Sequence, residues 1–466
     1  MTSTAQAALS GARPKPFWLD DATAPDPCPQ LVGDVDCDLA VVGGGYTGLW
    51  TALMAKERDP DLEVVLVEGR QVGWAASGRN GGFCSSSLTH GLANGIARFP
   101  DEMDVLERLG NENLDGIARS VDKYGIDCTF ERTGELTVAT EQWQVGELAK
   151  VAEQGRRYGQ NVELLDRAGV REEVDSPTYL GGLYDPDSTA MLNPAKLAWG
   201  LRDACLRLGV RIYENTRVYS VDAIRGHLQL PTPRGRVACD QVAIGTAAFP
   251  PLLQRIRAFV LPVYDYVLVT EPLSADQLAT VGWKRRSGVS DSGNQFHYYR
   301  LTDDNRILWG GYDAVYHYNN SVHSKRDQRP ATFHRLAEHF FATFPQLTGV
   351  RFTHTWGGVT DTCSRFCAFF GGAHAGRLAY AAGFTGLGVG ASRFAANVML
   401  DRLLEGTTEL TELRMVRSKP VPFPPEPLRY GLVALTRWSL ARADARDGRR
   451  NLWLRGLDRF GIGFDS

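Results

Sequence analysis

The chain has 466 residues, of which 43% are hydrophobic and 23% charged, and its formal net charge is −3. At about 150 residues per domain, this length predicts two or three domains with a sizeable core. The balanced charge excludes the basic surface typical of nucleic-acid binding. No stretch approaches the roughly 18 apolar residues of a membrane span, and the first residues lack the pattern of a secretion signal. We therefore expect a cytoplasmic protein.

The cysteines are scattered along the chain, a distribution typical of reduced thiols rather than of a disulfide framework. They are Cys28, Cys37, Cys84, Cys128, Cys205, Cys239, Cys363 and Cys367. The last two are close together, with His354 and His374 on either side, but they lack the regular spacing of a metal site. We expect no metal.

Residues 1–35 form a proline-rich arm, which favours extended chain ahead of the first domain. From Cys37, "CDLAVVGG" predicts a strand buried on both faces. "YTGLWTALMAKER" has apolar residues at helical spacing, and "LEVVLVEG" predicts a second buried strand. A strand, a helix and a strand within about 30 residues make one βαβ unit.

In the middle of the chain the hydrophobic pattern changes. "FERTGELTVAT" and "QFHYYRLTDDNRILWGGYD" alternate as antiparallel hairpins do. Between them, "NPAKLAWGLRDACLRLGVRIYEN" predicts a capped amphipathic helix that leads into a strand. "CDQVAIGTAA" and "RLAYAAGFTGLGVGASRFAANVMLDRLLEG" then return to the parallel pattern.

These patterns predict an α/β plus α+β fold, in which an antiparallel-sheet substrate domain is inserted into a discontinuous Rossmann-like domain. We expect the Rossmann-like domain to comprise residues 36–105, 190–250 and 350–405. The substrate domain comprises residues 106–189 and 251–349, and residues 406–466 form a C-terminal appendage. This appendage mixes Pro, Arg and aromatic residues, as a helical addition or a contact surface would.

Gly43, Gly45 and Gly48 fit the pattern G-x-G-x-x-G between the first strand and the first helix. In this motif the glycines permit a tight turn, close approach of a pyrophosphate and close packing of helix on strand. The helix N-terminus then favours the negative charge of the pyrophosphate. Glu68 ends the next strand and suits a ribose hydroxyl, which argues against the 2′-phosphate of NADP, although Arg70 is nearby. FAD and NAD both satisfy this pattern.

A second glycine cluster, "AASGRNGGF" from Ala75 to Phe83, begins to separate the two cofactors. Here the sequence resembles the FAD-dependent D-amino-acid oxidase-like amine oxidoreductases, which include sarcosine oxidase, glycine oxidase and γ-glutamylputrescine oxidase. The segment "SGRNGG" is most similar to that of the γ-glutamylputrescine oxidase branch. The resemblance runs from about Phe17 to Glu405 and includes "LPVYDYVLVTEPL", "WGGVTDT" and "GFTGLGVGASRFAANVML".

The resemblance implies which residues contact FAD. For the ADP half and the adenine they are Gly43, Gly45, Tyr46, Thr47, Gly48, Glu68, Gly69, Val218, Gly245 and Thr246. For the isoalloxazine ring they are Ser77, Gly78, Arg79, Asn80, Gly81, Gly82, Gly386, Leu387, Gly388 and Val389. Independently of the family, a glycine loop that opens a helix offers N–H donors and a positive dipole end to negative charge on the flavin.

The reaction that the resemblance implies removes a hydride from a C–H next to an amine nitrogen, and water hydrolyses the resulting imine to a carbonyl product. The substrate would be a small amine or an N-substituted amino acid, and oxygen would be reduced to hydrogen peroxide. Two alternatives stay open: a dehydrogenase that uses a quinone or a protein acceptor, and a flavoprotein subunit that has lost catalysis. The oligomeric state is also open.

Substrate contacts are expected from the antiparallel domain, with His297, Tyr299 and Arg300 as candidate catalytic residues. Alternate residues of a strand share a face, so His297 with Tyr299 and Tyr298 with Arg300 form two rival sets. An arginine can clamp a carboxylate, tyrosines such as Tyr264 and Tyr266 can surround a cationic amine, and histidine titrates near neutral pH. Structural packing is the competing interpretation of each.

Some relatives attach FAD covalently through a cysteine or a histidine. Cys363 and Cys367 do not occur in a pattern typical of that bond, so we expect noncovalent FAD. The stretch that follows Trp356 and Asp361 departs from many relatives, because "RFCAFFG" lacks the expected proline. We therefore carry over no flavin contact to that segment.

Overall fold

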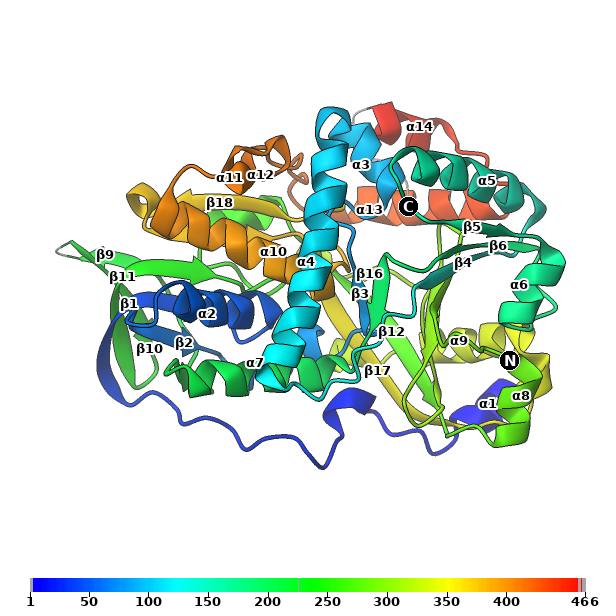
Figure 1. The fold of residues 1–466 in the computed structure, drawn as a ribbon, viewed down its shortest axis with the longest axis horizontal. Coiled ribbons are helices and arrows are strands. Elements are labelled where there is room, and N and C mark those ends of the chain that lie inside the picture. The colour runs from blue at the N-terminus through cyan, green and yellow to red at the C-terminus, as the bar shows by residue number, and fades with distance from the viewer. Residues whose placement is uncertain (1–2, 225, 460–461, 463–466) are drawn as a thin grey trace.

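The computed structural model describes residues 3–224, 226–459 and 462. Figure 1 shows two sheets side by side along the longest axis, with helices packed around both. In the view of Figure 1 the first sheet lies on the left and the second on the right. No helix among the described residues is long and apolar enough to cross a membrane.

The first sheet has eight strands, and a parallel set forms its centre. The order is β18 (Phe369–Ala373), β19 (Leu378–Ala382), β11 (Gly235–Ile244), β1 (Gly33–Val42), β2 (Val64–Val67) and β8 (Arg211–Tyr213), with β10 (His227–Thr232) and β9 (Asp222–Ile224) added at β11. β2 consists of four buried apolar residues, as expected for a parallel strand that is covered on both faces.

Three helices pack together against one face of this sheet: α2 (Tyr46–Arg58), α7 (Pro194–Arg207) and α10 (Gly388–Leu400). α7 begins where the sequence predicts, because the Asn193 side chain accepts a hydrogen bond from the Lys196 N–H (3.1 Å) and Pro194 occupies the first turn. The expected βαβ unit is thus present.

The second sheet has nine strands. Its order is β16 (Val315–Tyr316), β12 (Leu261–Thr270), β15 (Ile307–Gly311), β14 (His297–Leu301), β13 (Gly288–Asp291), β4 (Glu135–Ala139), β6 (Gly181–Asp185) and β5 (Glu163–Leu165). All of these pairs are antiparallel except β13 with β4. α9 (Pro330–Thr343) covers one face, where Trp309, Phe340 and Phe344 form a buried aromatic core.

One strand differs from the expected domain ranges. β17 (Phe352–Thr362) pairs along its length with β12, so it belongs to the second sheet. The sequence pattern predicts residues 350–405 in the Rossmann-like domain, and for residues 352–362 this prediction is wrong. Strand pairing between segments about 90 residues apart leaves no local signal, so the sequence pattern did not reveal it. From β18 onward the chain is back in the first sheet, as expected.

The remaining elements connect or flank the sheets. β3 (Phe83–Ser85) and β7 (Thr189–Met191) form a separate two-stranded sheet. The other helices are α1 (Ser3–Leu9), α3 (Leu92–Arg98), α4 (Met103–Tyr124), α5 (Gln142–Arg157), α6 (Arg167–Glu173), α8 (Ala275–Val281), α11 (Glu409–Glu412), α12 (Arg414–Arg417), α13 (Leu428–Asp444) and α14 (Leu452–Arg459). The N-terminal arm runs along the molecule, and α1 packs against α9. The predicted fold class is confirmed.

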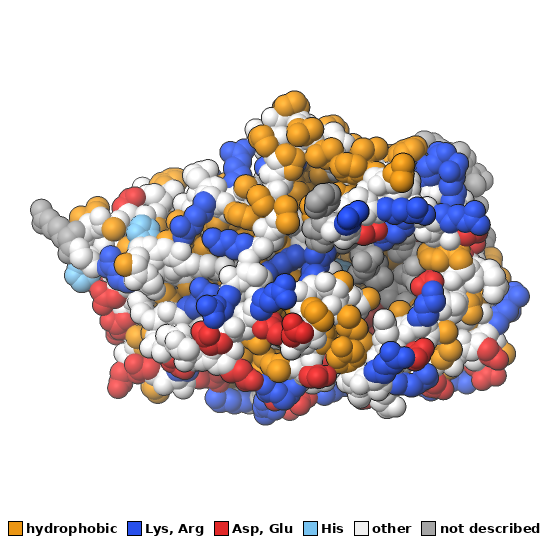
Figure 2. All heavy atoms as spheres, turned by 90° about the horizontal axis from the view of Figure 1, so that it is seen from above, with side chains coloured by type: hydrophobic (Ala, Val, Ile, Leu, Met, Phe, Trp, Pro, Cys, Tyr) orange, Lys and Arg blue, Asp and Glu red, His pale blue; other side chains and the backbone are white. Residues whose placement is uncertain are grey.

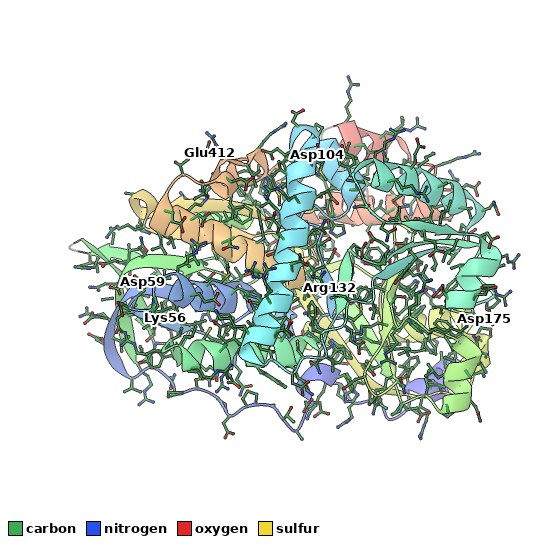
Figure 3. All side chains as sticks on the ribbon, in the orientation of Figure 1. Lys56, Asp59, Asp104, Arg132, Asp175 and Glu412 are labelled. Carbon is green, nitrogen blue, oxygen red and sulfur yellow. The ribbon has the colours of Figure 1, made fainter. Side chains whose placement is uncertain are left out.

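Charged side chains lie mainly at the periphery, as Asp59, Asp104 and Glu412 do in Figure 3. Seen from above, one margin of the face over the C-terminal helices carries a band of hydrophobic side chains beside Lys and Arg (Figure 2).

Candidate functional site

The loop between β1 and α2 requires glycine at the positions that the motif predicts. A Cβ atom on Gly48 would lie 1.9 Å from the Gly43 carbonyl oxygen, and one on Gly43 would lie 2.7 Å from the Gly245 carbonyl oxygen. Gly43 also has a positive φ of 112°. Among the described residues the backbone N–H groups of Thr47 and Gly48 have no acceptor, so the first turn of α2 presents free donors, as an anion site requires.

Glu68, directly after β2, lies beside this loop. Its carboxylate accepts hydrogen bonds from the N–H groups of Gly44 (2.7 Å) and Arg70 (2.8 Å) and from the Trp74 indole (3.0 Å). Burial raises the pKa of Glu68. A carboxylate held in this way can also accept from ribose hydroxyls, whereas it would repel a 2′-phosphate.

The other residues expected around the ADP half gather here as well. Gly245 donates its N–H to Val42 (2.9 Å) and ends β11 next to Thr47. A Cβ atom on Gly69 would lie 3.7 Å from Arg217 Cβ, so the segment with the buried Val218 runs beside the end of β2. Five separate segments therefore converge on the C-terminal edge of the first sheet. They contain Gly43–Gly48, Glu68–Gly69, Ser77, Val218 and Gly245–Thr246.

The second glycine loop, residues 77–82, lies between the two sheets. Ser77 Oγ accepts from the Tyr46 N–H (2.9 Å), and Asn80 Oδ1 accepts from the Gly82 N–H (2.8 Å). A Cβ atom on Gly82 would lie 2.1 Å from the Leu192 carbonyl oxygen, and one on Gly78 would lie 2.3 Å from that of Gly73. The loop is therefore fixed by contacts that only glycine allows.

The side chains of Arg79 and Asn80 act within this loop. Arg79 forms an ion pair with Asp327 (2.6 Å) and donates from Nε to the Trp74 carbonyl (2.8 Å). The Asn80 amide donates to the carbonyl oxygen of Ala76 (3.0 Å). Both side chains thus hold the shape of the loop.

The third expected loop, residues 386–389, meets the second one. A Cβ atom on Gly390 would lie 2.1 Å from the Ser85 carbonyl oxygen, so α10 begins against β3, the continuation of the second glycine loop. Gly386 has a positive φ of 92°. Asp361 holds the loop, because its carboxylate accepts the Gly383 N–H (2.6 Å) and its carbonyl accepts the Thr385 N–H (3.1 Å). Burial raises the pKa of Asp361 to about 6.

The two rival faces of β14 point in opposite directions. His297 and Tyr299 pack into the core under α9. His297 contacts Asp291 (Nδ1 to Oδ2, 2.7 Å) and His339 (Nε2 to Nδ1, 2.9 Å), and the hydroxyls of Tyr299 and Tyr179 are 2.5 Å apart. These two candidates therefore lie on the face of the sheet turned away from the glycine loops.

Tyr298 and Arg300 face the glycine loops. Arg300 is buried and donates to the carbonyl oxygens of Leu192 (2.8 Å) and Leu301 (3.0 Å). Burial lowers the pKa of Arg300 to about 10. Its hydrogen bonds join the sheet to the chain beside the second glycine loop.

Tyr298 is enclosed by two glycines. A Cβ atom on Gly81 or on Gly310 would lie 2.7 Å from its ring. Its hydroxyl donates to Asp265 Oδ2, and the Tyr266 N–H donates to Asp265 Oδ1 (2.8 Å). Burial raises the pKa of Asp265 to about 6. Both side chains keep some exposure, and the Tyr298 ring lies between the sheet and the second glycine loop.

Asp265 was missed by the sequence analysis, although one signal was present. It is the single acid in "LPVYDYVLV", an otherwise apolar and aromatic central strand, and an isolated acid in such a strand indicates a functional role. Glu135 was missed as well. It accepts from the Ser290 hydroxyl (2.9 Å) on the neighbouring strand, and burial raises its pKa.

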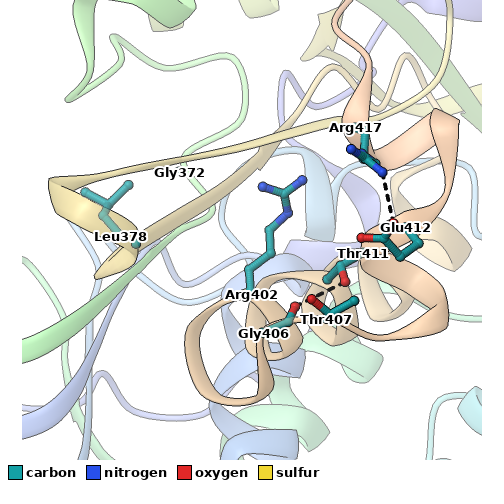
Figure 4. Close-up of a pocket in the computed structure, with 9 residues that line it drawn as sticks. Gly372, Leu378, Arg402, Gly406, Thr407, Thr411, Glu412 and Arg417 are labelled. Carbon is teal, nitrogen blue, oxygen red and sulfur yellow. Dashed lines mark hydrogen bonds and ion pairs between the residues drawn. The ribbon is translucent and has the colours of Figure 1, made fainter.

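A separate cavity of about 290 Å³ lies at the other end of α10 (Figure 4). Its lining includes Leu378, Arg402, Thr411, Glu412 and Arg417. Because α10 has 13 residues, at about 1.5 Å rise each, the cavity lies about 20 Å from the loop at its N-terminus. It is not part of the site described above.

Comparison with known proteins identifies relatives of this chain. A family model described as FAD dependent oxidoreductase matches residues 38–402. The γ-glutamylputrescine oxidoreductase of Escherichia coli is 34% identical over 405 residues, which cover 84% of this chain and 89% of that protein. A probable oxidoreductase of Haemophilus influenzae is 28% identical over 83% of this chain and 88% of its own length. The crystal structure of glycine oxidase from Geobacillus kaustophilus superposes with a TM-score of 0.67 at 19% identity, covering 82% of this chain and 99% of that one.

We predict that Gly48→Ala abolishes or strongly reduces flavin binding, because the new methyl group would collide with the Gly43 carbonyl and displace the loop. The ratio of flavin to protein absorbance in the purified variant measures this. Gly146→Ala is the control, because a Cβ atom there meets nothing within 4 Å. Full flavin content in Gly48→Ala would contradict the assignment of the loop.

Proposed function

Because the chain belongs to the family of FAD-dependent oxidoreductases, we propose that it oxidises a small amine or an N-substituted amino acid at the C–H next to nitrogen, with oxygen as the electron acceptor. FAD as the cofactor, expected from the second glycine cluster, is confirmed by the family match. The chain's own geometry fits it, since free N–H donors, an acceptor for ribose and two glycine loops occur in one continuous region.

We assign the cofactor contacts as the sequence predicts them. The first turn of α2 binds the pyrophosphate, Glu68 binds the ribose and the segment with Val218 lies by the adenine. The loops at residues 77–82 and 386–389 hold the isoalloxazine ring. When bound, FAD supplies the acceptor for the hydride of the substrate. The positive end of the α10 dipole stabilises negative charge on the pyrimidine side of that ring.

We propose that FAD is held without a covalent bond. Cys363 and Cys367 are buried, and the Cys363 thiol donates to the Cys367 carbonyl (3.1 Å). Burial raises the pKa of the Cys363 thiol to about 12. A thiol held in its protonated form is a poor nucleophile, which supports noncovalent binding.

The observation that carries the amine assignment is the Asp265–Tyr298 pair beside Gly81. A carboxylate next to the flavin loop can accept N–H donors of a cationic amine, while the Tyr298 hydroxyl fixes its orientation. Asp265, with a pKa of about 6, can also accept the proton that the ammonium group must lose before its C–H bond can be oxidised. Relatives named for γ-glutamylputrescine and for sarcosine support an amine substrate.

The first test is anaerobic reduction. We expect one class among γ-glutamylated polyamines, N-methyl amino acids and simple amines to bleach the visible flavin bands. Readmission of air should then restore the bands and release hydrogen peroxide, which a peroxidase assay measures. Bleaching without peroxide would instead favour a quinone or a protein as acceptor. If no amine changed the spectrum of the flavin-loaded protein, the amine assignment would be wrong.

A second prediction compares adjacent tyrosines that point to opposite faces of β14. Tyr298→Phe removes the hydrogen bond to Asp265 and is expected to lower kcat/KM about tenfold. Tyr299→Phe leaves the Tyr179 hydroxyl without its partner, so it should lower the free energy of unfolding by about 1 kcal/mol and leave kcat/KM within about twofold. Thermal unfolding and steady-state kinetics separate the two effects. The reverse pattern would place the substrate on the α9 face.

A third prediction concerns pH. Because Asp265 is ionised only above about pH 6, kcat/KM for a cationic amine should fall as the pH is lowered through this value. Asp265→Asn should lower kcat/KM by about ten- to a hundredfold and remove this acid limb. Asp291→Asn, on the other face, should keep the limb.

Stability provides the control for the Asp265 experiment. A carboxyl whose folded-state pKa is raised binds its proton more tightly in the folded chain than in the unfolded chain. The free energy of unfolding therefore falls as the pH rises toward about 6 and the Asp265 carboxyl ionises, and it stays lower at higher pH. Asp265→Asn should therefore unfold no earlier than the wild type at pH 8. An unchanged pH profile in a folded, flavin-loaded variant would exclude Asp265 from substrate binding.

A further inference from the structure

The C-terminal helices α13 and α14 lie outside residues 38–402 that the family model matches. α13 is nevertheless held by loops of the second sheet, and α14 packs on α13. The Asp444 carboxylate accepts from the backbone N–H groups of Asn294 (2.9 Å) and Gln295 (3.0 Å), and Arg429 donates to Asn320 (2.8 Å). Arg429, Leu440 and Ala443 are buried on the inner side of α13. The helix therefore has a fixed inner face and a fixed outer face.

The outer face of α13 is apolar. Leu428 is 56% exposed, Leu435 39% and Trp438 54%. These residues are separated by seven and three positions, so they lie along one side of the helix, and Gly431 lies between the first two. Leu452, at the start of α14, is 85% exposed. Large apolar side chains gathered at one place on the surface indicate an interaction site.

Exposed arginines lie toward the Trp438 end of this apolar stripe. Residues 428–459 contain eight arginines and three aspartates, a net charge of +5, whereas the whole chain carries −3. The exposed ones include Arg437, Arg442, Arg446, Arg449 and Arg455. The Arg442 guanidinium lies 5.2 Å from the centre of the Trp438 ring, so charge and apolar surface belong to the same patch. Hydrophobic side chains bordered by Lys and Arg are visible on the face over these helices in Figure 2.

We propose that the outer face of α13 and α14 docks on an anionic lipid surface. Leu428, Leu435 and Trp438 enter the interface between headgroups and acyl chains, and the exposed arginines bind phosphate headgroups. This combination of an apolar stripe with tryptophan and flanking arginines is typical of helices that lie in the plane of a membrane. The proposal does not depend on the substrate assignment.

A second copy of the chain is the competing occupant of the apolar stripe. A twofold interface would bring the same patch of both subunits together, and here each patch has a charge of +5. Repulsion between the two patches therefore opposes this arrangement. An anionic surface is attracted by the same arginines, so charge complementarity favours lipid.

The test is co-sedimentation of the flavin-loaded protein with vesicles. We expect binding to vesicles of equal parts phosphatidylglycerol and phosphatidylcholine, and binding at least about tenfold weaker to phosphatidylcholine alone. Added salt should weaken the binding to anionic vesicles. The double variant Arg442→Glu/Arg446→Glu should bind about tenfold or more weakly, and Trp438→Ser should also lose affinity.

The matched control is Val32→Ser, because Val32 is similarly exposed (63%) but lies directly before β1. It should bind vesicles as the wild type does, and all variants should keep their flavin content. Failure of the wild type to bind anionic vesicles, or equal binding by Trp438→Ser, would overturn the proposal. Analytical ultracentrifugation that showed a dimer abolished by Trp438→Ser would overturn it in favour of a second copy.

Discussion

The molecule depends on the close fit of residues 77–82 between its two sheets. From the N-terminal arm, the Trp18 indole donates to the Asn80 carbonyl (2.9 Å), and from β17 the Trp356 indole donates to the Arg79 carbonyl (2.9 Å). The Tyr298 ring from β14 lies against Gly81. Three segments distant in sequence thus meet one short loop. Since a Cβ atom at Gly78, Gly81 or Gly82 would collide with its surroundings, this fit requires the glycines, and it fixes the position of the loop against the second sheet.

The face of the second sheet that meets this loop carries an unusual amount of buried polarity. Asp265, Glu135 and Arg300 all lie there, and burial raises the pKa of both carboxyls and lowers that of Arg300. Burying a charge is costly unless hydrogen bonds satisfy it. Arg300 and Glu135 are satisfied by carbonyls and hydroxyls of the protein. Asp265 differs from Arg300 because it keeps some exposure, as Glu135 also does.

The sequence predicted the glycine positions that the backbone conformation requires. A glycine that must avoid a steric collision leaves a local signal, so the two glycine loops and the loop before α10 could be located in advance. Alternation along β14 correctly predicted that His297 shares a face with Tyr299, and Tyr298 with Arg300. Alternation cannot say which face meets the cofactor, because that depends on where α9 packs, and α9 lies about 30 residues downstream. The same limit hid the pairing of β17 with β12.

Backbone groups and side chains have different roles in the proposed site, and this difference bears on substrate specificity. The cofactor is approached largely by backbone N–H groups and by glycines, which many sequences can provide once a few positions are fixed. The substrate contacts that we propose are side chains, and Asp265 and Tyr298 come from two different strands of the second sheet. A substitution of Asp265 would test substrate binding without removing a contact to Gly81, whereas Tyr298 packs against that glycine. The family match therefore establishes the cofactor, and the proposed contacts of Asp265 are where substitutions test which amine is bound.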